Sequence, residues 1–303
     1  MTALYAVLII IGILVFLYFA GGLAMALYLF VIGKRTNDEV LEHEIKDKKY
    51  DISLLDIPCE HLYILSRFGY KLHGRLYMAE KPTHKFIVDL HGRHSSSISQ
   101  LKYLHIFTDL GYNVFVPDHR GCGESGGLFT TMGVYEKYDV MQWISVLKKK
   151  FPQAEFGIFG ESMGAATGIL ATSMDSRIKV LVSYCAFSSV TDLVSDLAGN
   201  AFPKWLKIFL PALYLVSFFF FGVNVPGNDI AKAAEKVKVP MLVLHSYDDM
   251  LINIREARKI LAANEKAEKV FFRGAAHARS YVEHPQEFSR AVTAFLKKHY
   301  PNE

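Results

Sequence analysis

The stretch "FGIFGESMGAATG", Phe156 to Gly168, contains the pentapeptide Gly160-Glu161-Ser162-Met163-Gly164. The apolar residues before it indicate a buried strand, and the small residues after it indicate a helix. A serine in the sharp turn between a strand and a helix is typical of a nucleophile elbow. Glycines suit the flanking positions because strand and helix approach too closely there for Cβ atoms. The pattern predicts an exposed nucleophile at Ser162.

The rest of the chain supports a mostly parallel sheet with helices on both faces. Short apolar runs alternate with amphipathic stretches of helical length such as "SQLKYLHIFTDLG" and "YDVMQWISVLKKKF". The stretch "HLYILSRFGYKLHGRLYMA" alternates apolar and polar residues around Gly69, which predicts two antiparallel strands joined by a turn. The apolar runs are "KFIVDL", "YNVFVPD", "EFGIFG", "IKVLVSY" and "VPMLVLHS".

A nucleophilic serine needs a histidine base, and that base needs a carboxylate partner. In a chain with this kind of elbow the order is serine, acid, histidine, each after a later strand. The run "VPMLVLHS" is followed by Asp248 and Asp249, and "KVFFRGAAHARSY" contains His277. The spacing from the strand favours Asp249 as the acid and leaves Asp248 as a solvated loop residue. We therefore expect a Ser162–Asp249–His277 triad.

An oxyanion hole requires main-chain N–H donors beside the nucleophile. The residue after the serine, Met163, is one expected donor. The loop in "FIVDLHGRHSSS" is expected to supply the other, from Arg93. His91 and His94 lack a third ligand at a convincing spacing, so we interpret His91 as a loop-shaping residue and expect no metal.

Composition excludes several classes of protein. The chain has 303 residues, is 51% hydrophobic and carries a formal charge of +4 without a basic tract interleaved with aromatic residues. Nucleic acid is therefore not an expected partner. The three cysteines are widely spaced, which gives no support to a disulfide framework.

The N-terminus is the strongest compositional signal. Residues 4–32 contain no charge, and about 20 apolar residues suffice to cross a bilayer. A cleaved signal peptide is the rival interpretation because Ala24-Met25-Ala26 resembles a cleavage site, but there is no basic segment before the apolar run. We expect an uncleaved membrane anchor over residues 1–33. Lys34 and Arg35 follow it, which favours a cytoplasmic catalytic domain.

The remaining boundaries follow from composition. Residues 34–58 are rich in acidic residues and lysine, and we expect a solvated linker or short helix that holds the domain off the lipid. The catalytic domain is expected over 59–303, with a lid insertion at about 187–237. The apolar centre of that lid, residues 208–223, is either a cap helix buried over the site or a flap that touches lipid.

The motifs together resemble the α/β-hydrolase superfamily, and more narrowly its single-span, membrane-anchored branch near the serine-aminopeptidase-like and acyl-hydrolase proteins. The resemblance covers about 62–300 and departs from the family at Ser246, where glycine is usual. It implies the triad and oxyanion donors named above, no cofactor, and hydrolysis of an ester, thioester or amide through an acyl-enzyme. The matching motifs are "FGYKLHG", "DLHGRHSS", "PDHRGCGESGG", "GESMGAATG", "LHSYDDMLIN" and "GAAHARSY".

Two classes of function follow. The apolar lid favours a membrane-anchored serine hydrolase acting on an ester or thioester of a lipid-like or acylated small molecule, with a peptidase ranked below an esterase. The alternative is a non-catalytic scaffold used for binding, against which the complete set of Ser162, Asp249 and His277 argues.

Overall fold

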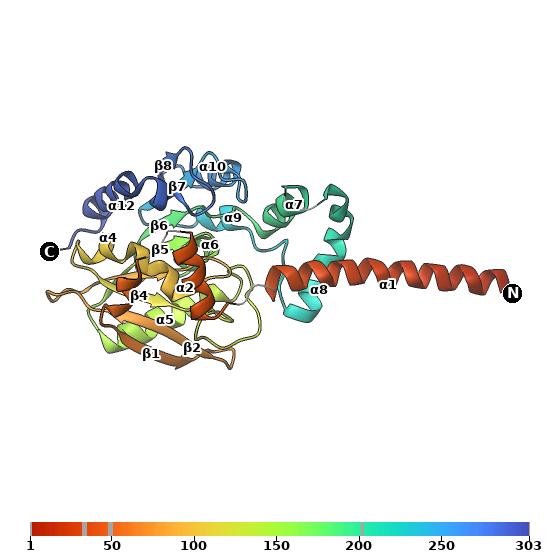
Figure 1. Ribbon diagram of the computed structural model, residues 1–303, viewed down its shortest axis with the longest axis horizontal. Helices are drawn as coiled ribbons and strands as arrows, with labels where there is room; N and C mark the ends of the chain where they lie inside the picture. The colour runs from red at the N-terminus through yellow and green to blue at the C-terminus, as the bar shows by residue number, and fades with distance from the viewer. Residues whose placement is uncertain (1, 32–34, 48–50, 201–202, 303) are drawn as a thin grey trace.

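The computed structural model describes residues 2–31, 35–47, 51–200 and 203–302, without the side chains of 198–200. Lys34, one of the two cations used above for orientation, lies outside these residues. A long helix projects from an α/β body, and a group of helices packs beside its C-terminal half (Figure 1). The helices are α1 (Thr2–Phe30), α2 (Asn37–Lys46), η1 (Ile52–Asp56), α3 (Ser97–Gln100), η2 (Leu101–Tyr103), α4 (Leu104–Thr108), α5 (Glu136–Lys150), α6 (Met163–Thr172), α7 (Val190–Asn200), η3 (Lys204–Phe209), α8 (Leu210–Phe221), α9 (Ile230–Ala234), α10 (Ile254–Ala263), α11 (Ser280–Glu283) and α12 (Pro285–His299).

The eight strands form one sheet in the order β1-β2-β4-β3-β5-β6-β7-β8. The first two form the expected hairpin around Gly69, pair antiparallel and join β4 antiparallel, whereas the strands from β4 to β8 are parallel. This arrangement confirms the predicted mostly parallel sheet. The strands are β1 (Glu60–Leu65), β2 (Lys71–Tyr77), β3 (Lys85–Leu90), β4 (Asn113–Pro117), β5 (Glu155–Glu161), β6 (Ile178–Tyr184), β7 (Met241–Ser246) and β8 (Glu268–Phe272).

Side-chain alternation along the central strands divides the core into two layers. In β5, Phe156 and Ile158 face the cluster that includes α5 and α6, and Phe159 faces the cluster with α4 and α12. Consecutive side chains of a strand point to opposite faces, so a strand covered on both faces is apolar throughout. This explains why these strands appear in the sequence as continuous apolar runs.

The stretch that sequence periodicity presents as one helical segment is broken into α3, η2 and α4. Its residues from Ser96 to Leu104 are all buried, so packing on two sides rather than helical periodicity fixes their main chain. Lys102 and Tyr103 in η2 both contact the carboxylate of Glu161, the residue directly before Ser162. Tertiary contacts thus override the local helical pattern here.

The helix α1 is docked onto the body by its C-terminal half. The Gly22 main chain packs against α8 so closely that a Cβ at Gly22 would lie 2.6 Å from the Ala212 Cβ. The Phe30 carbonyl accepts a hydrogen bond of 3.0 Å from the Thr130 N–H. By contrast, the large apolar side chains from Leu4 to Leu17 are each at least 50% exposed. By length and composition alone, both α1 and the segment η3–α8 are apolar enough to cross a membrane.

The stretch expected to be a solvated linker or short helix contains the short helix α2, in which Val40 and Glu44 are the buried residues. Thr36 begins this helix with a capping box in which the Glu39 carboxylate accepts a hydrogen bond of 2.7 Å from the Thr36 N–H. Val40 and Glu44 lie one turn apart, and both are buried. One face of the helix therefore packs on the catalytic body.

The lid region, residues 187–237, consists of α7, η3, α8 and α9, which agrees with a helical insertion. In α8, Ala212, Leu213 and Val216 are buried, whereas Phe219 and Phe220 are 74% and 76% exposed. One face of α8 packs on the protein and the other is uncovered. Its buried face is compatible with a cap helix, and its exposed face is compatible with a flap that touches lipid.

Candidate active site

Ser162 lies in the turn between β5 and α6 with φ of +55° and ψ of −115°. Such a conformation is strained for a residue with a side chain and is maintained by its surroundings. A Cβ at Gly160 would lie 2.6 Å from the Gly164 carbonyl carbon, and a Cβ at Gly164 would clash with the Leu90 main chain. The two glycines therefore permit the tight turn, as their sequence pattern predicts.

The structure brings Ser162, His277 and Asp249 into one hydrogen-bonded line. His277 Nε2 lies 3.0 Å from Ser162 Oγ, and His277 Nδ1 lies 2.7 Å from Asp249 Oδ2. A carboxylate only accepts hydrogen bonds, so Nδ1 carries the imidazole proton and Nε2 is free to accept from the serine hydroxyl. This is the geometry that a general base requires.

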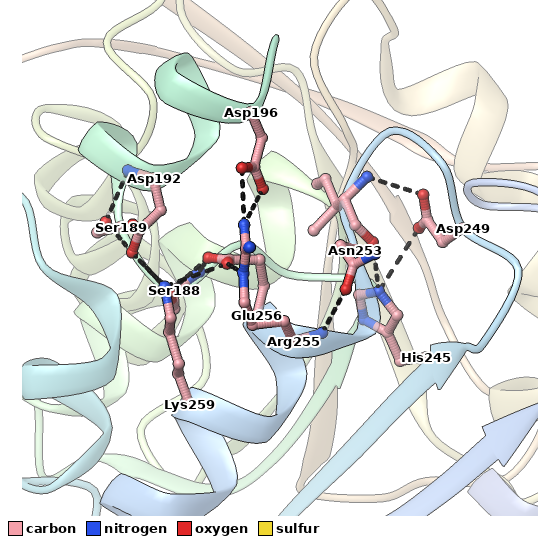
Figure 2. A network of polar contacts seen from close by, with 11 residues as sticks. Ser188, Ser189, Asp192, Asp196, His245, Asp249, Asn253, Arg255, Glu256 and Lys259 are labelled. Carbon is pink, nitrogen blue, oxygen red and sulfur yellow. Dashed lines mark hydrogen bonds and ion pairs between the residues drawn. The ribbon is translucent and has the colours of Figure 1, made fainter. Parts of the chain in front are cut away.

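The Asp249 carboxylate is held from several sides. Its Oδ1 accepts hydrogen bonds of 3.0 Å and 2.8 Å from the Leu251 and Ile252 N–H groups, and its side chain is 1% exposed. His245 Nε2 donates to the Ile252 carbonyl at 2.7 Å and lies 3.6 Å from Asp249 Oδ2 (Figure 2). Burial lowers the pKa of His245, which favours its neutral form.

Asp248 occupies a different environment from its neighbour. It is exposed, as expected, but its Oδ2 accepts a hydrogen bond of 2.6 Å from the Gly274 N–H. Gly274 has a φ of +71° and begins the loop that carries His277. Asp248 thus fastens that loop from the outside, while Asp249 contacts the histidine itself.

The two expected oxyanion donors flank the nucleophile. Met163 is the first residue of α6 and is fully buried. The loop after β3 passes so near that a Cβ at Gly92 would lie 3.4 Å from the Ser162 Cβ, and Arg93 follows it. The Arg93 guanidinium donates to the Tyr28 carbonyl of α1. His91 shapes this loop, because its Nδ1 donates to the Gly92 carbonyl at 2.7 Å and its Nε2 accepts from the His119 N–H at 2.9 Å.

Ser162, His277, Arg93 and His94 lie where two cavities of opposite character meet. One, of about 200 Å³, is otherwise mostly apolar, and its further lining residues are Tyr28, Met132, Met163, Phe187, Leu193, Leu197, Leu251 and Ile252. We call it the apolar pocket. The other, of about 220 Å³, is mostly polar, and its further lining residues are Arg35, Val40, His43, Glu44, Gly92, Ser95, Glu161 and Ala278. We call it the polar pocket.

A buried ion-pair network supports the polar pocket. Lys102 Nζ lies 3.2 Å from Glu161 Oε2 and 3.4 Å from Glu44 Oε2, and the side chains of all three are less than 10% exposed. Burial alone would lower the pKa of Lys102, but Glu161 and Glu44 together raise it above its ordinary value. The ammonium thereby fastens α2 to the strand that ends at the nucleophile. Burial, with Glu161 close by, raises the pKa of Asp89 well above its ordinary value.

The sequence did not reveal that the N-terminal region contributes to the site. Tyr28 of α1 lines the apolar pocket, whereas Arg35, His43 and Glu44 line the polar pocket. The available signal was the pair Val40 and Glu44 on one face of a helix with a capping box, which is also compatible with an ordinary surface helix. No neighbouring sequence feature identifies Lys102 as the partner of Glu44.

Residues with metal-binding chemistry occur elsewhere. Among the described residues, His61, His73 and Glu124 bring their ligand atoms within 4.8 Å of one another, and none of the three lines a pocket at Ser162. Asp118 accepts from His73 Nδ1 at 2.6 Å, but Arg75 lies 3.3 Å from Glu124 and already supplies a cation there.

The chain is similar to one known family and to several known proteins. The family "Serine aminopeptidase, S33" matches residues 81–226. The uncharacterized protein YqkD of Bacillus subtilis is 29% identical over 301 residues, which cover 96% of each chain. The lysophosphatidylserine lipase ABHD12 of Danio rerio is 26% identical over 61% of this chain and 49% of its own length. A monoglyceride lipase homolog of Monkeypox virus is 27% identical over 59% of this chain and 62% of its own length. The chain thus spans half to less than two thirds of the length of these two relatives.

Solved structures show the same fold. The esterase Pf2001 of Pyrococcus furiosus superposes with a TM-score of 0.66 at 23% identity, covering 82% of this chain and 94% of its own. An acylaminoacyl peptidase of Pyrococcus horikoshii gives a TM-score of 0.62 at 18% identity, covering 82% of this chain and 44% of its own. The sheet, the helical layers and these matches confirm the resemblance found in the sequence: the chain has the α/β-hydrolase fold.

Proposed function

We propose that the protein is a membrane-anchored serine hydrolase that cleaves a carboxylic ester or thioester of a lipid-like substrate through an acyl-enzyme. The observation that carries this proposal is the position of Ser162 where the apolar and polar pockets meet. A lipid ester is divided in the same way, because its scissile bond joins an apolar acyl group to a polar, hydrated alcohol. Two relatives, one named as a lysophosphatidylserine lipase and the other as a monoglyceride lipase homolog, support a monoacyl lipid as the substrate class.

The proposed reaction uses contacts already described. Ser162 Oγ attacks the ester carbonyl while its proton passes to His277 Nε2, and the Asp249 carboxylate stabilises the imidazolium. The N–H groups of Met163 and Arg93 are the proposed donors to the oxyanion. The alcohol or thiol leaves with the proton from His277, and the acyl group remains on Ser162. A water molecule then gives one proton to His277 and attacks the acyl carbonyl. The bond between the acyl group and Ser162 breaks, the carboxylic acid is released, and the proton returns from His277 Nε2 to Ser162 Oγ.

The pairing of both carboxylates in the polar pocket with Lys102 favours an ester over a peptide as the substrate. Glu44 and Glu161 would be the groups to bind a free amino terminus, but both already contact Lys102. Their charge is therefore largely compensated. Assays of aminoacyl p-nitroanilides beside monoacyl esters separate the two activities, and a higher kcat/KM for the anilides would reverse the ranking.

The direct test is Ser162→Ala in the full-length protein. We expect complete loss of monoacylglycerol and p-nitrophenyl ester turnover and of labelling by a fluorophosphonate, with an unchanged melting temperature, since the substitution removes one small hydroxyl. Asp248→Asn, purified and assayed in the same way, is a matched control. Persistent turnover or labelling of another serine would contradict the assignment and favour the scaffold alternative.

The anchor and its orientation are part of the same proposal. The exposed apolar surface of α1 supports membrane insertion, and the position of Arg35 after it favours a cytoplasmic catalytic domain. Carbonate washing should leave the protein in the membrane fraction. Protease added outside sealed cells should spare the domain; digestion there would reverse the orientation.

A further inference from the structure

We propose that the acyl chain of a membrane lipid reaches Ser162 along a groove between α1 and the lid helices, so that α1 forms a wall of the substrate site. This inference rests on the proposed function, since it names the path by which the lipid-like substrate enters. In addition to anchoring the protein, α1 would contact the acyl chain of the substrate.

The groove is a cavity of about 410 Å³ between α1, α7 and η3. From α1 it is lined by Ala24, Met25 and Tyr28 among others, and from η3 by Trp205 and Phe209. None of its described lining residues carries a charge. Binding there would cost a polar ligand its hydration without providing hydrogen bonds in return, whereas a hydrocarbon chain loses nothing of that kind.

The groove adjoins the apolar pocket at two side chains. Tyr28 of α1 and Leu197 of α7 line both cavities. The Arg93 guanidinium lies 5.3 Å from the centre of the Tyr28 ring and donates to the Tyr28 carbonyl, which joins this part of α1 to the loop beside Ser162. The groove and the apolar pocket thus form successive parts of one apolar path that ends at the nucleophile.

The outer end of this path lies among side chains suited to lipid. Trp205, which lines the groove, and Ile208, both of η3, are 65% and 64% exposed. They flank a helix whose N-terminal half is uncovered and long enough to enter a bilayer (Figure 1). Such an apolar surface beside a membrane helix places the groove within reach of acyl chains already in the bilayer.

The walls of the groove are held in place by contacts outside it. On α7, Asp196 pairs with Arg255 at 2.6 Å and Asp192 pairs with Lys259 at 2.7 Å, both on α10 (Figure 2). On α1, the close packing of Gly22 against Ala212 fixes the helix against α8. Because both walls are anchored to other helices, the groove exists before a ligand enters, which lowers the cost of binding.

The test narrows the groove without changing the triad. Ala24 is exposed and lines the groove, so the indole ring in Ala24→Trp should fill it. Leu23→Trp is the control, because it adds the same ring at the preceding residue, which lines neither cavity. Full-length protein in phosphatidylcholine vesicles is assayed with palmitoyl and acetyl esters of p-nitrophenol. We expect Ala24→Trp to lower the palmitoyl-to-acetyl ratio of kcat/KM at least tenfold, equivalent to about 1.4 kcal/mol. Leu23→Trp should leave this ratio within about twofold of wild type.

A second variant and a binding measurement cover the case in which Ala24→Trp fails to fold. Trp205→Ala removes an exposed ring that forms the opposite wall, and we expect the same ratio to fall at least threefold. A hexadecyl glyceryl ether with a diazirine in its chain cannot be hydrolysed. After irradiation in the vesicles it should label peptides of both α1 and η3, and less of each in Trp205→Ala.

The outcomes separate this inference from the proposed function. Unchanged ratios in both groove variants, or ether labelling confined to the exposed N-terminal half of α1, would overturn the groove while leaving ester hydrolysis intact. Ester turnover that survives Ser162→Ala would overturn the proposed function, whereas ether labelling in the groove does not depend on that serine.

Discussion

The two sides of Ser162 differ in chemistry but share their construction. On the apolar side, Tyr28 from α1 completes a wall made by α7; on the polar side, His43 and Glu44 from α2 complete a wall made by the loop after β3. In each case residues of the catalytic domain and residues of the N-terminal region line the same pocket. The N-terminal region therefore lines both cavities at Ser162, and removing it would change both pockets.

The largest effect is expected from a substitution in the triad, which should lower kcat equally for substrates that differ in the acyl chain or in the alcohol. Asp249→Asn removes the acceptor that orients His277, and we expect kcat to fall by about 10⁴-fold for every ester regardless of chain or alcohol. The measurement is kcat for palmitoyl and acetyl esters with one p-nitrophenol leaving group. Asp248→Asn, one residue away and exposed, should cost at most a few fold. The reverse ranking would mean that Asp248 is the acid.

An intermediate effect should be confined to the apolar side. Leu193→Ser with Leu197→Ser removes apolar surface from the α7 wall, and each lost methylene contact costs about 0.8 kcal/mol. We expect kcat/KM for palmitoyl esters to fall at least tenfold relative to acetyl esters. Phe218→Ser with Phe220→Ser is the matched control, since neither residue lines the apolar pocket or the groove. Equal losses in the two double variants would mean that the loss of chain-length preference is not specific to the α7 wall.

The smallest expected effect belongs to the polar side. Arg35→Ala removes a cation from that pocket, and we expect kcat/KM for a lysophospholipid to fall about threefold relative to a monoacylglycerol of the same chain. The ratio should move back toward wild type in Arg35→Lys, which keeps the charge. A change in chain-length preference instead would show that the two pockets are not independent.

The catalytic body was predictable from the sequence because its signals are local. Apolar runs bounded by turns indicate strands, and the glycines around Ser162 indicate a turn in which a Cβ would clash. The placement of Asp249 and His277 followed from their order after later strands. Which of two adjacent aspartates contacts His277 could also be inferred from spacing, because the loop after β7 is short.

The N-terminal contribution could not be predicted from such signals. An apolar helix has the same composition whether it crosses a bilayer alone or lines a groove. Tertiary contacts such as the approach of Gly22 to Ala212 distinguish the two. Likewise, Glu44 and Lys102 are 58 residues apart, and neither has a sequence feature that marks the other as its partner. These contacts depend on tertiary packing, which periodicity does not encode.

The central claim is that Ser162 is the nucleophile at the end of an acyl-binding path. The most direct measurement compares the second-order rates at which ethyl and hexadecyl fluorophosphonates inactivate the full-length protein, with the adduct located by mass spectrometry. We predict that both add to Ser162 and that the hexadecyl compound reacts at least tenfold faster. Adducts on another residue, or equal rates for the two compounds, would contradict the account.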